Sequence, residues 1–159
     1  MTRAHRFFSP NQARAVVAAA ERIFPADALG PGATEIGVVD YVDAAVAGDP
    51  AGLGELYRRG VERLDAETRT RAEVAFADAP AELQDVVLAE LEGTPFFETL
   101  LQHTREGLFA DPVHGGNRDM LGWRLLGHPG AQRGYGPEAY APDARIERPP
   151  RGLREWLAE

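Results

Sequence analysis

The sequence predicts an all-α protein: a single compact domain of about five to six helices, then an extended Gly- and Pro-rich carboxy-terminal tail. Apolar residues recur at the spacing of one helix face, and no stretch alternates apolar and polar residues as a half-buried strand does. Gly and Pro breaks separate the apolar segments. The 159 residues are enough for one core. We therefore expect a helical domain over residues 7–126 and an extended segment over residues 127–159.

The first helix is predicted to begin after Ser9 and to end at Pro25. Ser9 can cap the free backbone N–H groups, Pro10 suits the first helical position, and Gln12 completes a capping box. Apolar residues then recur at helical spacing as far as the terminating proline. A loop is expected over residues 26–37, where glycine and proline recur.

Further helices are predicted over residues 38–47 and 53–64, separated by a Gly-Asp-Pro break. A shorter helix is expected near residues 71–76. Another starts at residues 78–80 and is closed by Gly93, because glycine is the usual residue after a helix end.

The most apolar helix is predicted to open at Thr94-Pro95, which repeats the signal of a capping residue followed by proline. It continues through residues 96–109, and its apolar content indicates a central position. After a Gly-Gly-Asn loop, residues 120–126 are expected to form one or two helical turns. Gly, Pro, Tyr and Arg dominate residues 127–159, which we interpret as a segment that lies along a protein surface.

Composition and charge exclude several classes of function. The net charge of −8 argues against nucleic-acid binding, which normally shows a basic stripe. The excess is uneven: residues 1–100 contain 17 acids and 9 arginines, whereas residues 101–159 contain 8 of each. The absence of cysteine excludes disulfides, thiolate metal sites and Cys nucleophiles. No apolar run approaches the roughly 20 residues of a membrane-spanning helix.

No secretory signal is predicted at the amino-terminal end. Phe7-Phe8 leads directly into the first helix, without the basic segment and apolar stretch that such a signal needs. The pair Arg58-Arg59 lies inside a predicted helix and is not an export signal. We expect a cytoplasmic protein, or a periplasmic one if a twin-arginine leader was removed or if the protein is exported by another route, for example with a partner.

One alternative hypothesis is a small metal-dependent enzyme that uses His103, Asp111, His114 and His128. Imidazole and carboxylate groups are common ligands of zinc and iron, although this spacing matches no known site. A carboxylate-bridged di-iron bundle needs Glu three residues before its His. Leu100 stands at that position, so the sequence excludes this type of centre.

Other candidate catalytic groups have simpler interpretations. Asp40 and Asp43 are interpreted as two solvated acids in an early helical turn, where the helix dipole favours them. Ser9, the one serine, is needed as a helix cap, which removes a serine triad. The glycines of residues 127–136 follow no strand and so do not form a phosphate cradle. We therefore predict no catalytic, metal-binding or cofactor-binding residue in this chain.

The loop over residues 111–119 is the most distinctive part of the sequence. Asp111 can accept backbone N–H groups, Gly115-Gly116 can reverse the chain, and Asp119 can cap the helix that carries Trp123. A second interpretation, with equal weight, is that this loop and the tail contact another protein.

The second interpretation predicts a partner-binding surface. Tryptophan buries a large area and keeps a polar group, so Trp123 is either core or interface and Trp156 favours interface. The predicted surface combines the loop with its aromatic neighbours and the tail: Phe109, Asp111, Pro112, His114, Gly115, Gly116, Asn117, Arg118, Asp119, Trp123, Tyr135, Tyr140 and Trp156. A self-associating helical scaffold without an enzyme partner is a third hypothesis.

Over roughly residues 7–136 the chain resembles the small-subunit family of gluconate 2-dehydrogenase (subunit 3). The most specific match is Asp111-Pro112-Val113-His114-Gly115-Gly116-Asn117-Arg118-Asp119 with Gly122-Trp123. Weaker matches occur in the right order at residues 8–12, 23–25, 30–33, 37–43, 96–97 and 104–107.

This resemblance implies the role of an accessory subunit. Members of the family accompany a large FAD-dependent dehydrogenase of the glucose-methanol-choline type, often with a cytochrome c subunit, and the complexes oxidise sugars, sugar acids or glycosides. The small chain is not the redox centre: it stabilises or matures the large subunit and frequently carries its export signal. The resemblance thus places FAD in the partner and no cofactor in this chain. In this accessory-subunit hypothesis, the Gly-, Pro-, Tyr- and Arg-rich residues 127–159 wrap the large subunit.

Overall fold

The computed structural model describes residues 4–131, 134, 137 and 149–158, and it confirms the all-α class. Within these residues the α-helices are α1 (Pro10–Ile23), α2 (Ala33–Ile36), α3 (Val38–Gly48), α4 (Leu53–Ala72), α5 (Ala81–Ala89), α6 (Pro95–Phe109), α7 (Leu121–Leu126) and α8 (Leu153–Leu157). Three short 3-10 turns join them: η1 (Phe76–Asp78), η2 (Pro112–His114) and η3 (Arg118–Met120).

The predicted helix caps are present. The Ser9 hydroxyl accepts a hydrogen bond from the Gln12 backbone N–H, and the Gln12 side chain accepts one from the Ser9 N–H at 3.0 Å. Thr94 caps α6 by accepting from the Phe97 N–H, with proline at the first helical position. Both helices therefore begin where the sequence signals place their starts.

Helix α4 is longer than predicted. The sequence suggests an end near residue 64 and a second short helix, but α4 continues to Ala72 in one piece. Its polar extension carries ion pairs one turn apart, Asp65 with Arg69 at 3.1 Å and Glu67 with Arg71 at 2.9 Å. Such pairs stabilise a helix whose apolar stripe has become thin.

The four-residue helix α2 lies within the segment predicted as a loop. Its Ala33 and Ile36 are buried, and the Glu21 carboxylate accepts the Thr34 backbone N–H at 2.8 Å. Burial alone would raise the pKa of Glu21, but the hydrogen bonds from Thr34 and Ala26 outweigh it and hold the pKa below its usual value. A glutamate on α1 thus supplies the cap that the local sequence lacks.

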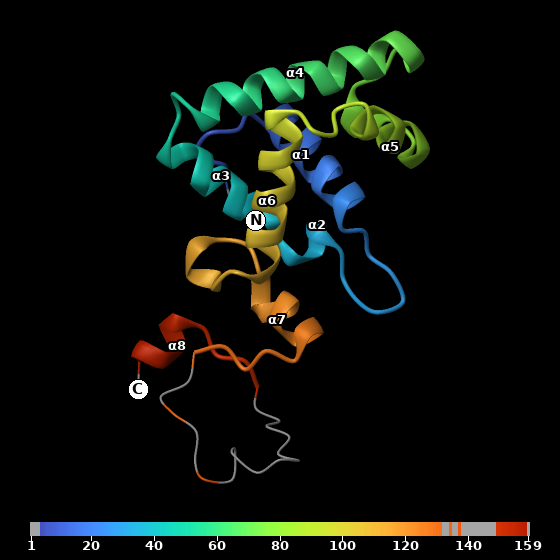
Figure 1. The fold of residues 1–159 in the computed structure, drawn as a ribbon. Helices are drawn as coiled ribbons and strands as arrows, with labels where there is room; N and C mark the ends of the chain where they lie inside the picture. Colours follow the sequence, from blue (N-terminus) through green and yellow to red (C-terminus); the bar gives the residue numbers. More distant parts are fainter. Residues whose placement is uncertain (1–3, 132–133, 135–136, 138–148, 159) are drawn as a thin grey trace.

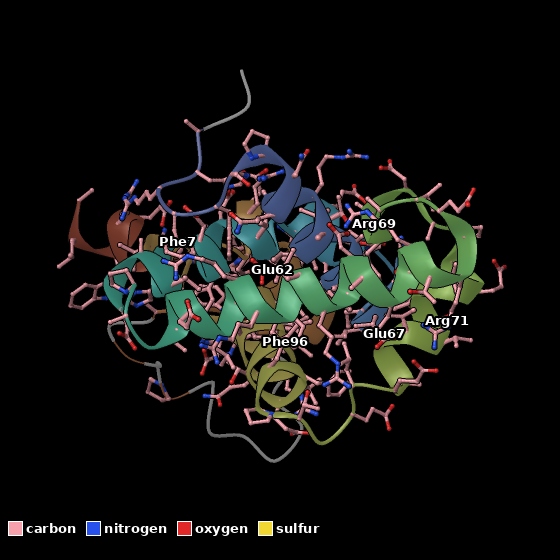
Figure 2. The ribbon with its side chains drawn as sticks, turned by 90° about the horizontal axis from the view of Figure 1, so that it is seen from above. Phe7, Glu62, Glu67, Arg69, Arg71 and Phe96 are labelled. Atoms are coloured by element: carbon pink, nitrogen blue, oxygen red, sulfur yellow. The ribbon has the colours of Figure 1, made fainter. Side chains whose placement is uncertain are left out.

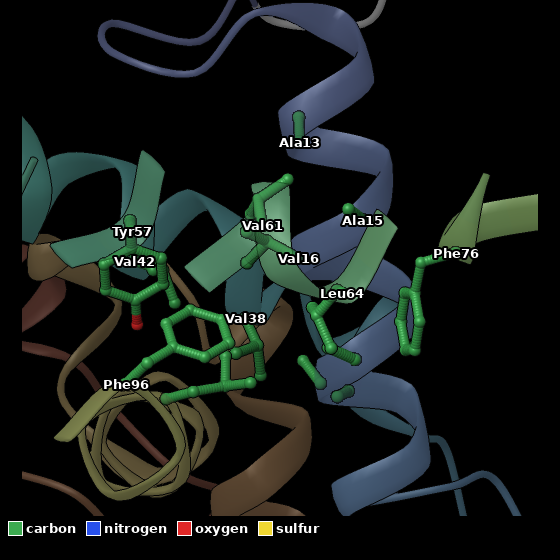
Figure 3. Close-up of a cluster of buried hydrophobic side chains, with 14 of the residues drawn as sticks. Ala13, Ala15, Val16, Val38, Val42, Tyr57, Val61, Leu64, Phe76 and Phe96 are labelled. Atoms are coloured by element: carbon green, nitrogen blue, oxygen red, sulfur yellow. The ribbon is translucent and has the colours of Figure 1, made fainter. Parts of the chain in front are cut away.

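The core lies where α1, α3, α4 and α6 meet, and α6 runs through the middle of the helices as predicted (Figure 1). Figure 3 shows side chains from α1, α3 and α4 converging beside Phe96 of α6. The largest fully buried members include Tyr57, Leu64 and Leu100, each with no exposed surface. Each such side chain contributes about 1.5–3 kcal/mol on leaving water, so apolar burial stabilises this part of the molecule.

Asp43 corrects one prediction. The sequence suggests a solvated acid, yet its side chain is buried and accepts the backbone N–H groups of Arg6 at 2.6 Å and of Phe7 and Phe8 at 3.0 Å. Burial would raise the pKa of Asp43, but the three N–H groups outweigh it and lower the pKa. Asp43 therefore fastens the segment before α1 to α3.

The described residues divide into two regions that differ in how they are held. We call residues 10–109 the helical body, and residues 110–131 with 149–158 the distal end. Helix α4 crosses the end of the body opposite α7 and α8 (Figure 1). Figure 2, which looks down on α4, shows Phe7 near its start and Arg69 and Arg71 near its far end. In the described part of the chain, no helix combines the length and apolar character needed to cross a membrane.

Candidate partner interface

Asn117 organises the loop between α6 and α7. Its side chain is fully buried, with Nδ2 donating to the Ala110 carbonyl at 2.8 Å and Oδ1 accepting the Gly122 N–H at 2.9 Å. Its own N–H donates to the Gly107 carbonyl at 2.7 Å. The backbone is left-handed at φ 38°, a conformation that Asn tolerates better than most residues. One residue thus joins the end of α6 to the start of α7.

The two glycines before Asn117 let the loop lie directly on the helical body. Both have positive φ, 97° at Gly115 and 53° at Gly116, and reverse the chain as predicted. A Cβ on Gly116 would overlap the Gly107 carbonyl oxygen of α6, and one on Gly115 would lie 2.8 Å from the Asp40 carbonyl oxygen of α3. The Gly-Gly pair therefore has a packing role.

Asp111 joins the loop to the carboxy-terminal segment. Its Oδ1 accepts the Val113 N–H at 2.9 Å, as the sequence predicts, and its Oδ2 accepts the Leu153 N–H of α8 at 2.8 Å. The second bond caps a helix that begins 42 residues later in the chain, and its own Gly152 offers no side chain for this. A parallel bridge between Gly130 and Arg151 joins the segment after α7 to the segment before α8.

Trp123 belongs to the core of the distal end. Its indole is 6% exposed, its Nε1 donates to the Phe109 carbonyl at 2.7 Å, and its ring meets the His128 ring edge to face. Of the two roles that the sequence left open, this burial agrees with the core role. The predicted cap Asp119 is wrong: Asp119 has φ 53° and its carbonyl accepts from Arg124, while the Asn117 amide takes the Gly122 N–H.

The other residues of the predicted surface lie in varied surroundings. His114 and Arg118 are exposed, with Arg118 paired to Asp40 at 3.2 Å. Pro112 begins η2 and is half-buried. The half-buried residues also include Phe109, whose ring packs edge-on against Phe24, and Trp156 of α8. Tyr135 and Tyr140 lie outside the described residues.

The structure does not support the metal-enzyme hypothesis. Among the residues that the structure describes, which include His103, Asp111, His114 and His128, no three potential ligands lie close enough together to hold a metal ion. His103 is buried in the body, where its Nδ1 lies 2.9 Å from the Tyr57 hydroxyl. Burial lowers the pKa of His103 and so favours a neutral ring. The charge of Glu106 acts in the opposite direction but is the smaller effect.

A polar pocket of about 200 Å³ opens beside the loop. It lies between the segment before α1, helix α3, η2 and α8. His5, Arg6 and Arg154 line it together with Asp40 and His114. Of these residues the sequence analysis predicted only His114 as part of a surface. Four segments that are distant in the sequence form the pocket, and no local pattern signals that they meet.

Exposed leucines form a second feature that the sequence analysis missed. Leu126 of α7 is 63% exposed and Leu29 is 86% exposed. The loop of Leu29 lies on α7, because a Cβ on Gly30 would overlap the Leu125 side chain. Single exposed leucines are ordinary, but here Leu29, Leu125 and Leu126 are exposed on two segments in contact, which is typical of an interaction surface. The spacing within α7 could have indicated this, since its two last residues are both apolar.

Comparison with known proteins identifies the family. The chain matches no curated protein and no solved structure. Its residues 10–130 match the family model described as gluconate 2-dehydrogenase subunit 3, which covers the body, the loop and α7. The match includes the Asp111–Asp119 motif on which the resemblance in the sequence depends. This chain therefore belongs to the gluconate 2-dehydrogenase subunit 3 family.

Proposed function

We propose that this chain is a non-catalytic accessory subunit. It binds and stabilises or matures a large FAD-dependent dehydrogenase of the glucose-methanol-choline type, which oxidises sugars, sugar acids or glycosides. Membership of a family named for a dehydrogenase subunit supports an association with dehydrogenase subunits. The large flavoprotein and its substrate class come from the resemblance in the sequence and are part of the proposal.

The observation that carries the proposal is the structural use of the residues that are able to do chemistry. Ser9 caps α1, Asp43 binds three backbone N–H groups, and His103 is paired with Tyr57 inside the body. The motif loop is likewise engaged: Asn117 and Asp111 satisfy backbone groups. These roles favour a chain that works by presenting a surface.

The flavin is assigned to the partner. FAD-binding cradles of the dinucleotide type follow a β-strand and open a helix. The described residues of this chain contain helices and isolated bridges, so they do not fit such a cradle. We also propose that the complex of the two chains is cytoplasmic or, if another route exports it, periplasmic, where a cytochrome c subunit is a further partner.

The test is to express a large FAD-dependent dehydrogenase from the same genome, sought first among the genes that neighbour this one, with and without the chain. We expect the dehydrogenase alone to be poorly soluble or flavin-deficient, and the two chains to co-purify when expressed together. Full yield, flavin content and activity in the absence of the chain would overturn the proposal. The purified chain should show no flavin or haem absorbance band, and a band would contradict the non-redox role.

A matched pair of variants makes the test specific to the distal end. Leu126→Arg places a charge on an exposed α7 residue without disturbing the core, and it should reduce co-purification. Val86→Arg, at a 51% exposed position of α5 in the body, should leave co-purification unchanged. If a tagged copy of the chain co-purifies with untagged copies of itself and not with the dehydrogenase, the result would instead support the helical scaffold hypothesis.

A further inference from the structure

The two carboxylates that line the pocket beside η2 are already engaged. Asp43 accepts three backbone N–H groups from the segment before α1. Asp40 forms an ion pair with the Arg118 guanidinium at 3.2 Å. Asp40 therefore has a counter-ion, and the hydrogen-bond acceptors of Asp43 are taken up by backbone N–H groups.

The arginines of the same pocket are in the opposite situation. Arg6 and Arg154 line the pocket from the segment before α1 and from α8, and both residues are exposed. The ion pairs found among the described residues include neither guanidinium. His5 and His114 add ring N–H donors to the lining. In a chain with a net charge of −8, this pocket thus brings together two guanidinium groups that lie outside those ion pairs and two imidazole rings that can donate hydrogen bonds.

The surroundings of the pocket favour a protein side chain over a small free anion. Val113 lines the pocket and is 39% exposed, and Leu153, which precedes Arg154 on α8, is also 39% exposed. Protein interfaces commonly combine an arginine with exposed apolar neighbours, which a partner covers as it docks. A small anion would gain nothing from those neighbours.

We propose that this pocket receives an aspartate or glutamate side chain of the dehydrogenase subunit, with Arg154 and Arg6 as its partners. Guanidinium groups bind carboxylates through paired, charge-assisted hydrogen bonds, which give both energy and orientation. The pocket then fixes how the small subunit sits on the large one. This inference rests on the proposed function, since it requires that the two chains form a complex.

The composition of the chain allows a site-specific test, because it contains no lysine. The Arg154→Lys variant introduces a single side-chain amine at the pocket. A carbodiimide joins an amine to a carboxylate with which it is in direct contact. In the complex with the dehydrogenase subunit, we expect this variant to form a covalent heterodimer, with mass spectrometry locating the link at an acidic residue of the dehydrogenase.

Two controls make the result decisive. The wild-type chain measures any link through its terminal amine and any link between its own carboxylates and lysines of the dehydrogenase. Arg63→Lys places an amine on the exposed face of α4, outside the pocket lining. Neither control should give a link from an introduced lysine to an acidic residue of the dehydrogenase, whereas Arg154→Lys should give one from residue 154. A complex that forms normally but gives no link above these controls would overturn the pocket inference and leave the proposed function intact. Failure of the wild-type chains to form a complex would overturn the proposed function, and the pocket inference with it.

A second measurement uses affinity. Arg154→Glu reverses the charge at the pocket and should weaken binding of the dehydrogenase subunit by roughly tenfold or more, as expected of an interface arginine facing a carboxylate. Arg63→Glu makes the same charge change on α4 and should alter binding by less than about twofold. Equal effects of the two variants would show that only net charge matters and would overturn the inference.

Discussion

The helical body and the distal end are held by different kinds of interaction. In the body, buried apolar side chains such as Leu64 and Leu100 pack between long helices. In the distal end, short turns are held by hydrogen bonds from Asn117, Asp111 and the Trp123 indole to backbone groups. A segment with little regular structure must satisfy its buried backbone groups through side chains, and these residues do so.

This difference changes how the motif is interpreted. An unusual run of Asp, Gly and Asn in a loop suggests a functional site, yet here these residues mainly place the loop on α6 and α3. The surfaces available to a partner are the neighbouring exposed groups, Arg154 and Leu126 among them. The motif is thus best understood as the support on which an interaction surface is built.

The largest effect is expected from Leu100→Ala, which removes a fully buried side chain from α6 at the centre of the body. The free energy of unfolding should fall by about 2–5 kcal/mol, because a cavity replaces apolar contacts. Both tryptophans lie in the distal end, so their fluorescence reports on that region while circular dichroism reports mainly on the body. The two signals should shift together. Leu126→Ala, at an exposed position, is the control and should have little effect.

Asn117→Ala tests the distal end separately. It leaves the Gly122 N–H and the Ala110 carbonyl without their partner, at a cost of about 2–4 kcal/mol for two buried groups. We expect the fluorescence of Trp123 to change at lower denaturant concentration than the circular dichroism. Asn117→Gly keeps the left-handed backbone and loses only the side chain, so it separates hydrogen bonding from strain. Coincident transitions would mean that the two regions unfold as one unit.

Asp43 should make the junction before α1 sensitive to acid. Because its pKa in the folded chain is below the usual 3.8, the stabilising contribution is present above that value and is lost as the pH falls through the folded pKa. Asp43→Asn removes the charge at all pH values and should cost about 1.5–3 kcal/mol at neutral pH, the range for hydrogen bonds to a charged group.

The measurement for Asp43 is urea unfolding between pH 7 and pH 2, in which wild type and variant should converge at low pH. Asp40→Asn is the matched control on the same helix, because Asp40 is partly exposed and pairs with a single side chain. A constant difference between wild type and Asp43→Asn over the whole pH range would contradict the proposed role of the carboxylate charge.

The sequence predicts the regular elements better than the contacts between distant segments. Ser9 and Thr94 signal the helix starts because capping depends on residues within one turn. The burial of Asp43 depends on N–H groups more than 30 residues away, and the pocket depends on α8 reaching η2. Local patterns hold no information on such contacts. For this reason the prediction that Asp43 is solvated is wrong, and the sequence does not indicate a role for Arg154.

Within the motif, too, local properties are predicted better than contacts that depend on the folded backbone. Gly115-Gly116 as a chain reversal is a local property and is confirmed. The cap of α7 is a different case: Asp119 stands at the expected distance in sequence, but its left-handed backbone leaves the Asn117 amide as acceptor of the Gly122 N–H. Residue type and spacing thus predict that a side chain caps the start of α7. The backbone conformation determines that this side chain is Asn117 and not Asp119.

The smallest effect is expected from Arg71→Met, which tests whether surface ion pairs contribute to either region. Arg71 pairs with Glu67 on its own helix and with Glu90 at the end of α5, at 2.9 and 2.8 Å. Exposed pairs gain little because water and salt screen them. The midpoint of thermal unfolding should therefore change less than in Leu100→Ala, Asn117→Ala or Asp43→Asn. Arg63→Met, on the same helix and outside the observed ion pairs, is the control.

Added salt distinguishes a charge effect of Arg71 from a packing effect of its side chain. At about 1 M salt the screening length falls to roughly 3 Å, so any difference between wild type and Arg71→Met that arises from charge should disappear. A difference that persists in salt would come from packing of the arginine stem between α4 and α5. A loss of stability comparable to that of Leu100→Ala would contradict the conclusion that apolar burial stabilises the body. One exposed cation would then contribute as much as a core side chain.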